Sequence, residues 1–149
     1  MLRGSFMRVS DQEIEKNMAL HRDRLQHLLD SPTHEFSSSD RRSIPDVPGV
    51  YVIYDKTGKQ ILYIGESDNM RRRLFGDHRA GNRRGSAFRK ALSRWEKMED
   101  EKEIREYIIQ NCSFQVLPVP DKLERKRFEH FAIAVLNPRL NDVVRLKIV

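Results

Sequence analysis

A first stretch of apolar residues at helical spacing begins after a capping box, in which Ser10 stands three residues before Glu13. The pattern runs through Asp30 and predicts a helix. Its apolar positions are Ile14, Met18, Leu25, Leu28 and Leu29. Residues 31–43 are rich in Pro, Ser, Thr and charge, and they predict a polar linker. We therefore expect an N-terminal helix and linker over residues 1–43 and a compact domain over residues 44–149.

Two short apolar runs follow, one on either side of a turn. Residues Gly49 to Tyr54 favour a strand, residues 56–59 centre on the turn residue Gly58, and Gln60 to Gly65 favour a second strand. Together they predict a β-hairpin.

Helical patterns then alternate with one more strand. Asp68, Ser86 and Asp121 can each cap the start of a helix, and Asp121 forms a capping pattern with Glu124. The predicted elements are a helix from Asp68 to Phe75, a helix from Ser86 to Trp95, a charged helix over Ile104–Ile109, a strand over Phe114–Val119, and a helix from Asp121 to Leu136. The fold class is therefore α+β. Its small antiparallel sheet has three strands, or four if residues 143–149 pair as a terminal strand, and helices flank it.

Length and charge narrow the picture. With 149 residues and 38% apolar content, the chain can bury one ordinary core. The net charge of +6 favours an anionic partner. The excess of positive charge is concentrated between Arg71 and Arg94, where the only acid is Asp77. The cations of this basic block are Arg71, Arg72, Arg73, Arg79, Arg83, Arg84, Arg89, Lys90 and Arg94.

The single cysteine, Cys112, excludes an internal disulfide and a cysteine-cluster metal site. No apolar run is long enough to span a membrane, and the first seven residues are too short and polar for a secretory signal. These features predict a cytoplasmic protein without a membrane partner. The leucines of the N-terminal helix suggest a homodimer contact.

Five separately spaced motifs carry a family resemblance. Gly49-Val50-Tyr51 and Tyr63-Ile64-Gly65 lie eleven residues apart on the predicted hairpin, and Asn69 and Arg73 follow Gly65 by four and eight residues. Glu129 precedes Pro138 by nine residues and Asn141 by twelve. Over residues 44–141 the chain thus resembles the GIY-YIG nucleases. The resemblance implies an endonuclease that hydrolyses phosphodiester bonds, DNA foremost, with Mg²⁺ or Mn²⁺ as its cofactor.

The two tyrosines alternate with apolar neighbours on adjacent strands, so both hydroxyls are expected on one side of the hairpin. By analogy with the family, Tyr63 activates the attacking water and Tyr51 supports it. A free tyrosine has a pKa near 10, so this role requires a nearby Arg or metal charge. The alternative is that both are half-buried strand aromatics.

Arg73 lies one helical turn after Asn69 on the same face, where its planar guanidinium can stabilise charge on a phosphate. Glu129 falls on the side of its helix that carries Phe128 and Val135, so its carboxylate needs compensation, which a metal ion would supply. The alternative is an ion pair with Arg125, one turn back. A single protein carboxylate leaves most ligands to water and phosphate, which suits Mg²⁺.

Three further positions belong to the expected site. Asn141 is predicted to fix a water, the phosphate or the chain after Pro138; otherwise it is a turn residue. His78 comes five residues after Arg73, about 140° around an α-helix, so it joins the site only if the helix is irregular, for instance at Gly76. Gly65 leaves room for a phosphate or for the start of the next helix, or simply ends a strand.

The expected catalytic residues are therefore Tyr51, Tyr63, Arg73, His78, Glu129 and Asn141, with Glu129 as the metal ligand. The expected nucleic-acid contacts are Gly65, Asn69, Arg72, Arg79, Arg83, Arg84, Arg89 and Lys90. The rival hypothesis is a non-catalytic nucleic-acid-binding module with a degenerate nuclease fold.

Overall fold

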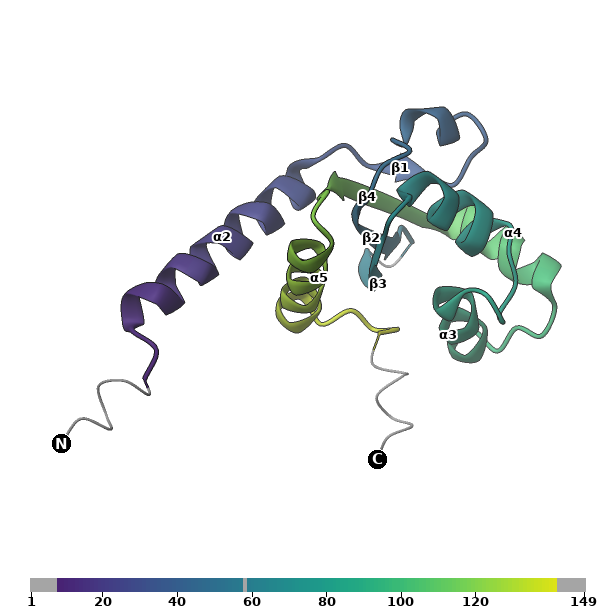
Figure 1. The fold of residues 1–149 in the computed structure, drawn as a ribbon. Helices are drawn as coiled ribbons and strands as arrows, with labels where there is room; N and C mark the ends of the chain where they lie inside the picture. The colour runs from purple at the N-terminus through teal and green to yellow at the C-terminus, as the bar shows by residue number, and fades with distance from the viewer. Residues whose placement is uncertain (1–7, 58, 142–149) are drawn as a thin grey trace.

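The computed structural model describes residues 8–57 and 59–141 and has an antiparallel sheet between two helical layers (Figure 1). The α+β class is confirmed. In chain order the elements are α2 (Asp11–Asp30), β1 (His34–Glu35), the 3₁₀ turn η1 (Arg41–Ser43), β2 (Gly49–Asp55), β3 (Gln60–Ser67), the π-helix η2 (Arg72–Arg79), α3 (Ala87–Trp95), α4 (Glu101–Asn111), β4 (Cys112–Pro118) and α5 (Lys122–Leu136).

The four strands lie in the order β1-β4-β2-β3, so the predicted hairpin supplies the centre and one edge of the sheet. Tyr51 pairs with Gly65 across the hairpin, and Ile53 pairs with Tyr63. A bulge follows at Tyr54. The fourth strand described is β1, which pairs with β4; the terminal strand expected over residues 143–149 lies outside the described residues.

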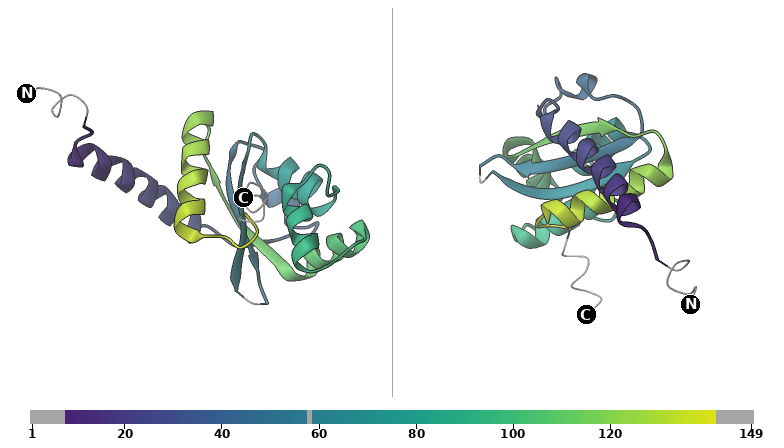
Figure 2. Two further views of the ribbon diagram at one scale, coloured as in Figure 1. Left: turned by 90° about the horizontal axis from the view of Figure 1, so that it is seen from below. Right: turned by 90° about the vertical axis from the view of Figure 1, so that its left-hand side faces the viewer.

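Each face of the sheet has its own core, because side chains alternate between faces along β2. Tyr51 and Ile53 join the core under η2, α3 and α4, whereas Val50 and Val52 join the core under α2 and α5. The left view of Figure 2 shows the sheet edge-on, with α5 on one side and α3 and α4 on the other. The expected catalytic residues on the hairpin therefore lie on the η2 side.

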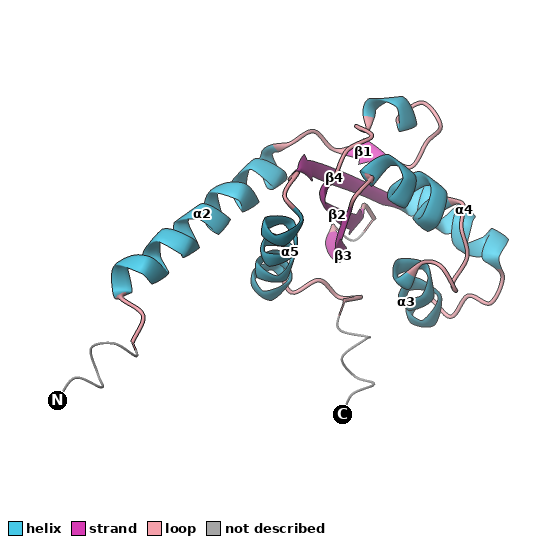
Figure 3. Ribbon diagram, viewed as in Figure 1, coloured by secondary structure: helices cyan, strands magenta, loops and turns pink. Residues whose placement is uncertain are grey.

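The C-terminal part of the N-terminal helix packs on its own chain. Leu25 and Leu28 are buried in the core under α5, so the leucines expected at a homodimer contact are used within the chain. The outer half of α2 extends away from the sheet (Figure 1). Part of the predicted linker is also built into the domain, because β1 pairs with β4 and Phe36 is fully buried. Figure 3 shows this short strand between loop segments.

Side-chain caps fix where most helices begin. Ser10, Ser86 and Asp121 each accept a hydrogen bond from the third residue of their helix, as predicted. The expected cap at Asp68 is wrong: Asn69 accepts from the Arg72 amide at 3.0 Å, and Asp68 instead forms an ion pair with the Arg72 side chain. Within the described residues no helix has the length and hydropathy of a membrane span. The cytoplasmic location stays a prediction.

Candidate active site

The two tyrosines meet at one histidine. The Tyr51 hydroxyl and His78 Nε2 share a hydrogen bond of 2.6 Å, and His78 Nδ1 shares another of 2.7 Å with the Ser86 hydroxyl. The rings of Tyr51 and Tyr63 lie 5.5 and 5.9 Å from the His78 ring, both edge-on. The structure therefore brings both tyrosines to one side of the hairpin and places His78 between them and α3.

The unusual helix η2 explains why His78 reaches this position. Its N–H groups bond five residues back, as from Ala80 to the Phe75 carbonyl at 3.2 Å. In an α-helix, His78 would lie about 140° around from Arg73. The wider π turn brings residues five apart to nearly the same side. The irregularity expected at Gly76 thus takes the form of a widened helix, which continues through that glycine.

Gly65 serves the tyrosine rather than a ligand. A Cβ at Gly65 would lie 2.6 Å from Cζ of Tyr51 and closer still to its hydroxyl. Because Gly65 has no side chain, the Tyr51 ring can cross from β2 over β3 and fill that space. The expectation that Gly65 leaves room for a phosphate or for the next helix is not met, because the tyrosine occupies that room.

Arg73 faces the same cluster from η2. Its guanidinium lies 3.4 Å from Asp77 in a half-exposed ion pair, and its charge lowers the pKa of His78 and opposes the rise in the pKa of Tyr63. The charge is thus near both rings, yet its guanidinium is only partly engaged. A phosphate oxygen at the cluster can take the guanidinium as a hydrogen-bond donor.

Glu129 completes the cluster from α5. Its side chain is 19% exposed, and burial raises its pKa to about 7, helped by the charge of Glu66. The expected rival partner, Arg125, does not pair with it: Arg125 Nε donates to Glu66 at 2.7 Å, and Lys126 lies 3.7 Å from the same carboxylate. Among the described residues, the one basic side chain within 4 Å of Glu129 is the exposed His130, whose Nε2 lies 3.8 Å away.

Glu66 was missed at the sequence level, although its position held a signal. It directly follows the Tyr63-Ile64-Gly65 motif on β3, and its charge reaches both Tyr51 and Glu129. By holding Arg125 it leaves Glu129 without an arginine partner. The prediction that Val135 shares the buried side of α5 is wrong, because Val135 is 54% exposed.

The tyrosines are protonated in this state. Burial raises the pKa of Tyr51 well above its ordinary value, and the neighbouring Tyr63 adds to the rise, because two phenolates so close together would repel each other. Burial and then Glu129 raise the pKa of Tyr63, and Arg73 opposes that rise. The charge of Arg73 alone therefore does not produce a Tyr63 phenolate.

The Asn141 side chain makes two hydrogen bonds to the backbone of β3. Its Oδ1 accepts from the Ile64 amide at 2.8 Å and its Nδ2 donates to the Ile64 carbonyl at 2.9 Å. These two bonds tie the chain after Pro138 to the edge of β3, beside Gly65. Of the roles expected for Asn141, the geometry favours fixing this chain over fixing a water or a phosphate.

The basic block divides into solvent-facing and internal side chains. Arg72 and Arg84 are exposed, whereas Arg83 donates to Glu101 and to the Glu99 carbonyl. The expectation that Arg89 contacts nucleic acid is wrong, since it is 1% exposed and donates to the carbonyls of His78, Arg79 and Glu101. It holds the end of η2 against α4. Lys90 is exposed beside it on α3.

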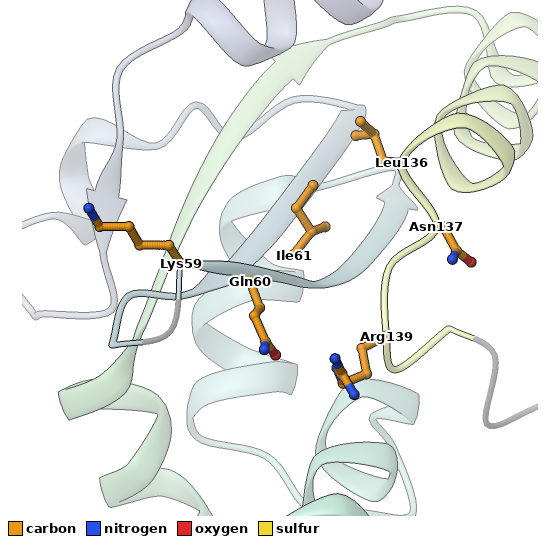
Figure 4. A pocket seen from close by; sticks show the side chains of 6 residues that line it. All are labelled: Lys59, Gln60, Ile61, Leu136, Asn137 and Arg139. Carbon is orange, nitrogen blue, oxygen red and sulfur yellow. The ribbon is translucent and has the colours of Figure 1, made fainter.

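A separate hollow of about 540 Å³ lies between the start of β3 and the end of α5 (Figure 4). Gln60, Asn137 and Arg139 are among its lining residues. None of the clustered tyrosine, histidine or glutamate side chains lines it. Its size is therefore no guide to the chemistry of this protein.

The neutral state of His78 gives a pH prediction. Burial, with help from Arg73 and Arg89, lowers the pKa of His78 from 6.5 to about 3. Folding thus favours the neutral ring, so its stabilising contribution is complete above pH 6.5 and is lost as the pH falls from 6.5 towards 3. We expect this group to account for about 2–4 kcal/mol of acid destabilisation.

Urea unfolding at a series of pH values measures this contribution. His78→Asn should flatten the decline of the free energy of unfolding over that interval, whereas His130→Asn, on the surface of α5, should leave it unchanged. Equal pH dependence in the wild type and His78→Asn would contradict the assignment.

Part of the chain is similar to a known protein family and to known proteins. The GIY-YIG catalytic domain model matches residues 47–115. UvrABC system protein C of Flavobacterium psychrophilum is 28% identical over 104 residues, covering 70% of this chain and 14% of that protein. The Flavobacterium johnsoniae protein of the same name is 28% identical over 103 residues, with 69% and 14% covered. The chain thus spans a small part of these relatives.

Solved structures similar to this chain include the GIY-YIG N-terminal endonuclease domain of UvrC from Thermotoga maritima, in point mutants bound to a catalytic divalent cation. One has a TM-score of 0.41 at 18% identity and covers 68% of this chain and 90% of that domain. Another has a TM-score of 0.41 at 20% identity and covers 70% and 96%.

Proposed function

The chain carries a GIY-YIG catalytic domain, and from that premise we propose that it is a divalent-metal-dependent endonuclease that hydrolyses phosphodiester bonds in DNA. The observation that supports this most is the convergence of a paired tyrosine–histidine, a partly exposed arginine and a desolvated carboxylate from three elements, β2, η2 and α5. Hydrolysis needs an activated water, neutralisation of the developing charge and help for the leaving oxygen. Each need has a residue in this cluster.

Tyr63 is the proposed group that activates water. It is protonated in the free protein, so it takes up this role only when a cation stabilises its phenolate. Tyr51 is held by His78, which is itself held by Ser86, so this chain of hydrogen bonds fixes the ring beside Tyr63. His78 stays neutral, and it therefore orients Tyr51 without adding charge.

Glu129 is the proposed metal ligand. Its carboxylate is desolvated and has no Arg or Lys within 4 Å among the described residues, although the charge of Lys126 reaches it, and an oxygen ligand of this kind fits a hard cation such as Mg²⁺ or Mn²⁺. The described residues hold no cluster of three or more His, Cys, Asp or Glu able to bind a metal. Water and phosphate would fill the remaining positions. A bound cation would supply positive charge to a phosphoryl oxygen and to the attacking water.

Arg73 is the proposed stabiliser of charge on the phosphate. Arg73→Ala should lower the cleavage rate by about 10²- to 10³-fold with little change in DNA affinity, because the interaction strengthens as charge develops. Arg72→Ala is the matched control on the same helix and should weaken DNA binding while leaving the rate at saturation unchanged. Single-turnover cleavage and binding measured in EDTA separate these effects; a loss of affinity alone in Arg73→Ala would contradict its assigned role.

Cleavage assays test the proposed function directly. Purified protein is incubated with supercoiled plasmid, linear duplex and branched DNA, each with Mg²⁺, Mn²⁺ or EDTA. We expect cutting of at least one substrate that depends on the metal. Binding without metal-dependent cutting on every substrate would instead identify a non-catalytic nucleic-acid-binding module.

A further inference from the structure

Arginines from three elements gather on the side of η2 next to the segment before β2. Arg41 and Arg42 of η1 and Arg71 before η2 line a hollow of about 240 Å³. Arg79, at the end of η2, and Arg105, on α4, extend the same charge: burial lowers the pKa of Arg79 first, and the charges of Arg105 and Arg41 lower it further. We call these five residues the arginine pocket. In Figure 1 the turn η1 lies beyond β1, on the same side of the sheet as η2.

Backbone contacts fix the pocket before any ligand arrives. Arg71 Nε donates to the Ile44 carbonyl at 2.8 Å, and the Met70 amide donates to the Val47 carbonyl at 3.0 Å. Ile44 itself is fully buried. The segment after η1 is thus tied to the start of η2, so little ordering remains to be done when a ligand binds.

The charge of the pocket is not neutralised within the described residues. None of its five arginines lies within 4 Å of a carboxylate there, because the nearby acids are engaged elsewhere. Asp40 accepts from the Glu35 amide at 2.6 Å, and Glu101 on α4 pairs with Arg83 and Arg89. Arg79 Nε is buried and has no hydrogen-bond partner. Like charges held together in this way are unfavourable unless an anion joins them.

We propose that the arginine pocket binds backbone phosphates of the nucleic acid whose scissile bond lies at the tyrosine cluster. This proposal rests on the proposed function. His78 on η2 bonds to Tyr51 of the hairpin, whereas Arg71 and Arg79, at the two ends of the same helix, bond to the segment before β2. A ligand that crosses η2 would therefore meet both the tyrosine cluster and the arginine pocket. A duplex carries a phosphate charge about every 1.7 Å along its axis, so it can supply phosphates along the whole path. The arginine fork suits such oxygens.

Binding measured in EDTA tests the pocket without requiring cleavage. The probe is a fluorescein-labelled duplex, titrated by anisotropy across a KCl series with the full chain. Arg41→Ala combined with Arg42→Ala should weaken binding equally on unrelated sequences and make the slope of log K against log [KCl] shallower by about 2. Lys16→Ala combined with Arg22→Ala removes the same charge from exposed positions on α2 and should change neither. Lysine at positions 41 and 42 should restore most of the slope.

Three results would contradict the proposal that the arginine pocket binds backbone phosphates. The first is a salt slope of the Arg41/Arg42 variant equal to that of the α2 variant. The others are saturable binding of inorganic phosphate with unchanged duplex affinity, and binding to phosphatidylserine vesicles in place of DNA. The proposed function fails independently, if the wild type binds duplex through these arginines but never cuts. The converse result is a pocket variant that binds DNA like the wild type and still cuts it in a metal-dependent way. That result would support the nuclease function and contradict phosphate binding by the arginine pocket.

Discussion

Glu129→Gln should lower the rate of metal-dependent cutting by about 10³-fold or more while leaving the fold intact. Glutamine has the same shape and can still accept the hydrogen bond that the Glu66 amide offers to this carboxylate. What the substitution removes is the negative charge that would bind a cation. The loss should therefore appear in chemistry and in metal affinity together.

The Glu129 carboxylate is available for a cation because a residue of β3 binds the arginine that would otherwise pair with it on α5. Arg125 lies one turn before Glu129 on α5, a spacing at which an ion pair is common. Glu66 on β3 takes that arginine instead, at 2.7 Å, and Glu129 keeps a pKa raised to about 7. Removing its charge should consequently leave the free energy of unfolding near neutral pH unchanged or slightly higher, since a desolvated charge is unfavourable.

Mn²⁺ binding followed by electron paramagnetic resonance, urea unfolding and single-turnover cleavage together check this prediction. Glu124→Gln is the matched control, an exposed glutamate on the same helix whose ion pair with Arg24 lies at the surface. It should behave like the wild type. Cutting by Glu129→Gln at the wild-type rate would mean that the metal, if one is used, is held elsewhere.

The extent to which the site could be predicted depended on how local each signal was. Spacing within the hairpin placed Tyr51 and Tyr63 on one face, because strand periodicity fixes side-chain direction over a few residues. His78 was harder to place, since a one-residue excess relative to α-helical register can mean either exclusion from the site or a widened helix. The sequence shows the extra residue between Arg73 and His78, but it does not show which of the two outcomes occurs. The contacts of His78 with Ser86 and Phe88 decide this, because they hold the ring in the site.

The partners of charged residues could not be predicted from local sequence patterns. A run of arginines predicts a solvated face, and this holds for Arg72, yet Arg89 is enclosed by three carbonyls from two separate segments, the end of η2 and the start of α4. Likewise the pairing of Arg125 with Glu66 joins residues 59 positions apart. Such partners are set by tertiary packing, so no local pattern distinguishes them from surface charges. The two-residue strand β1 was missed for the same reason, being too short to show alternation.

Gly65→Ala should destabilise the protein and displace the Tyr51 ring. The new Cβ would lie 2.6 Å from Cζ of Tyr51, whose ring is 2% exposed and is held at its far end by His78. Neither the ring nor the paired strand can yield without losing that bond. Overpacking of this kind costs about 1–3 kcal/mol, and a displaced Tyr51 should lower cleavage by at least about 10²-fold.

Gly76→Ala is the matched control, because its Cβ would meet only the Arg72 side chain, at 3.7 Å, on the exposed side of η2. Urea unfolding and single-turnover cleavage of both variants decide the matter. Gly76→Ala should be neutral or stabilise by up to about 1 kcal/mol, as expected for alanine in a helix. If Gly65→Ala proved as stable and as active as Gly76→Ala, the Tyr51 ring would have another place to go, and the tyrosine–histidine pair would not be the fixed element on which the proposed chemistry depends.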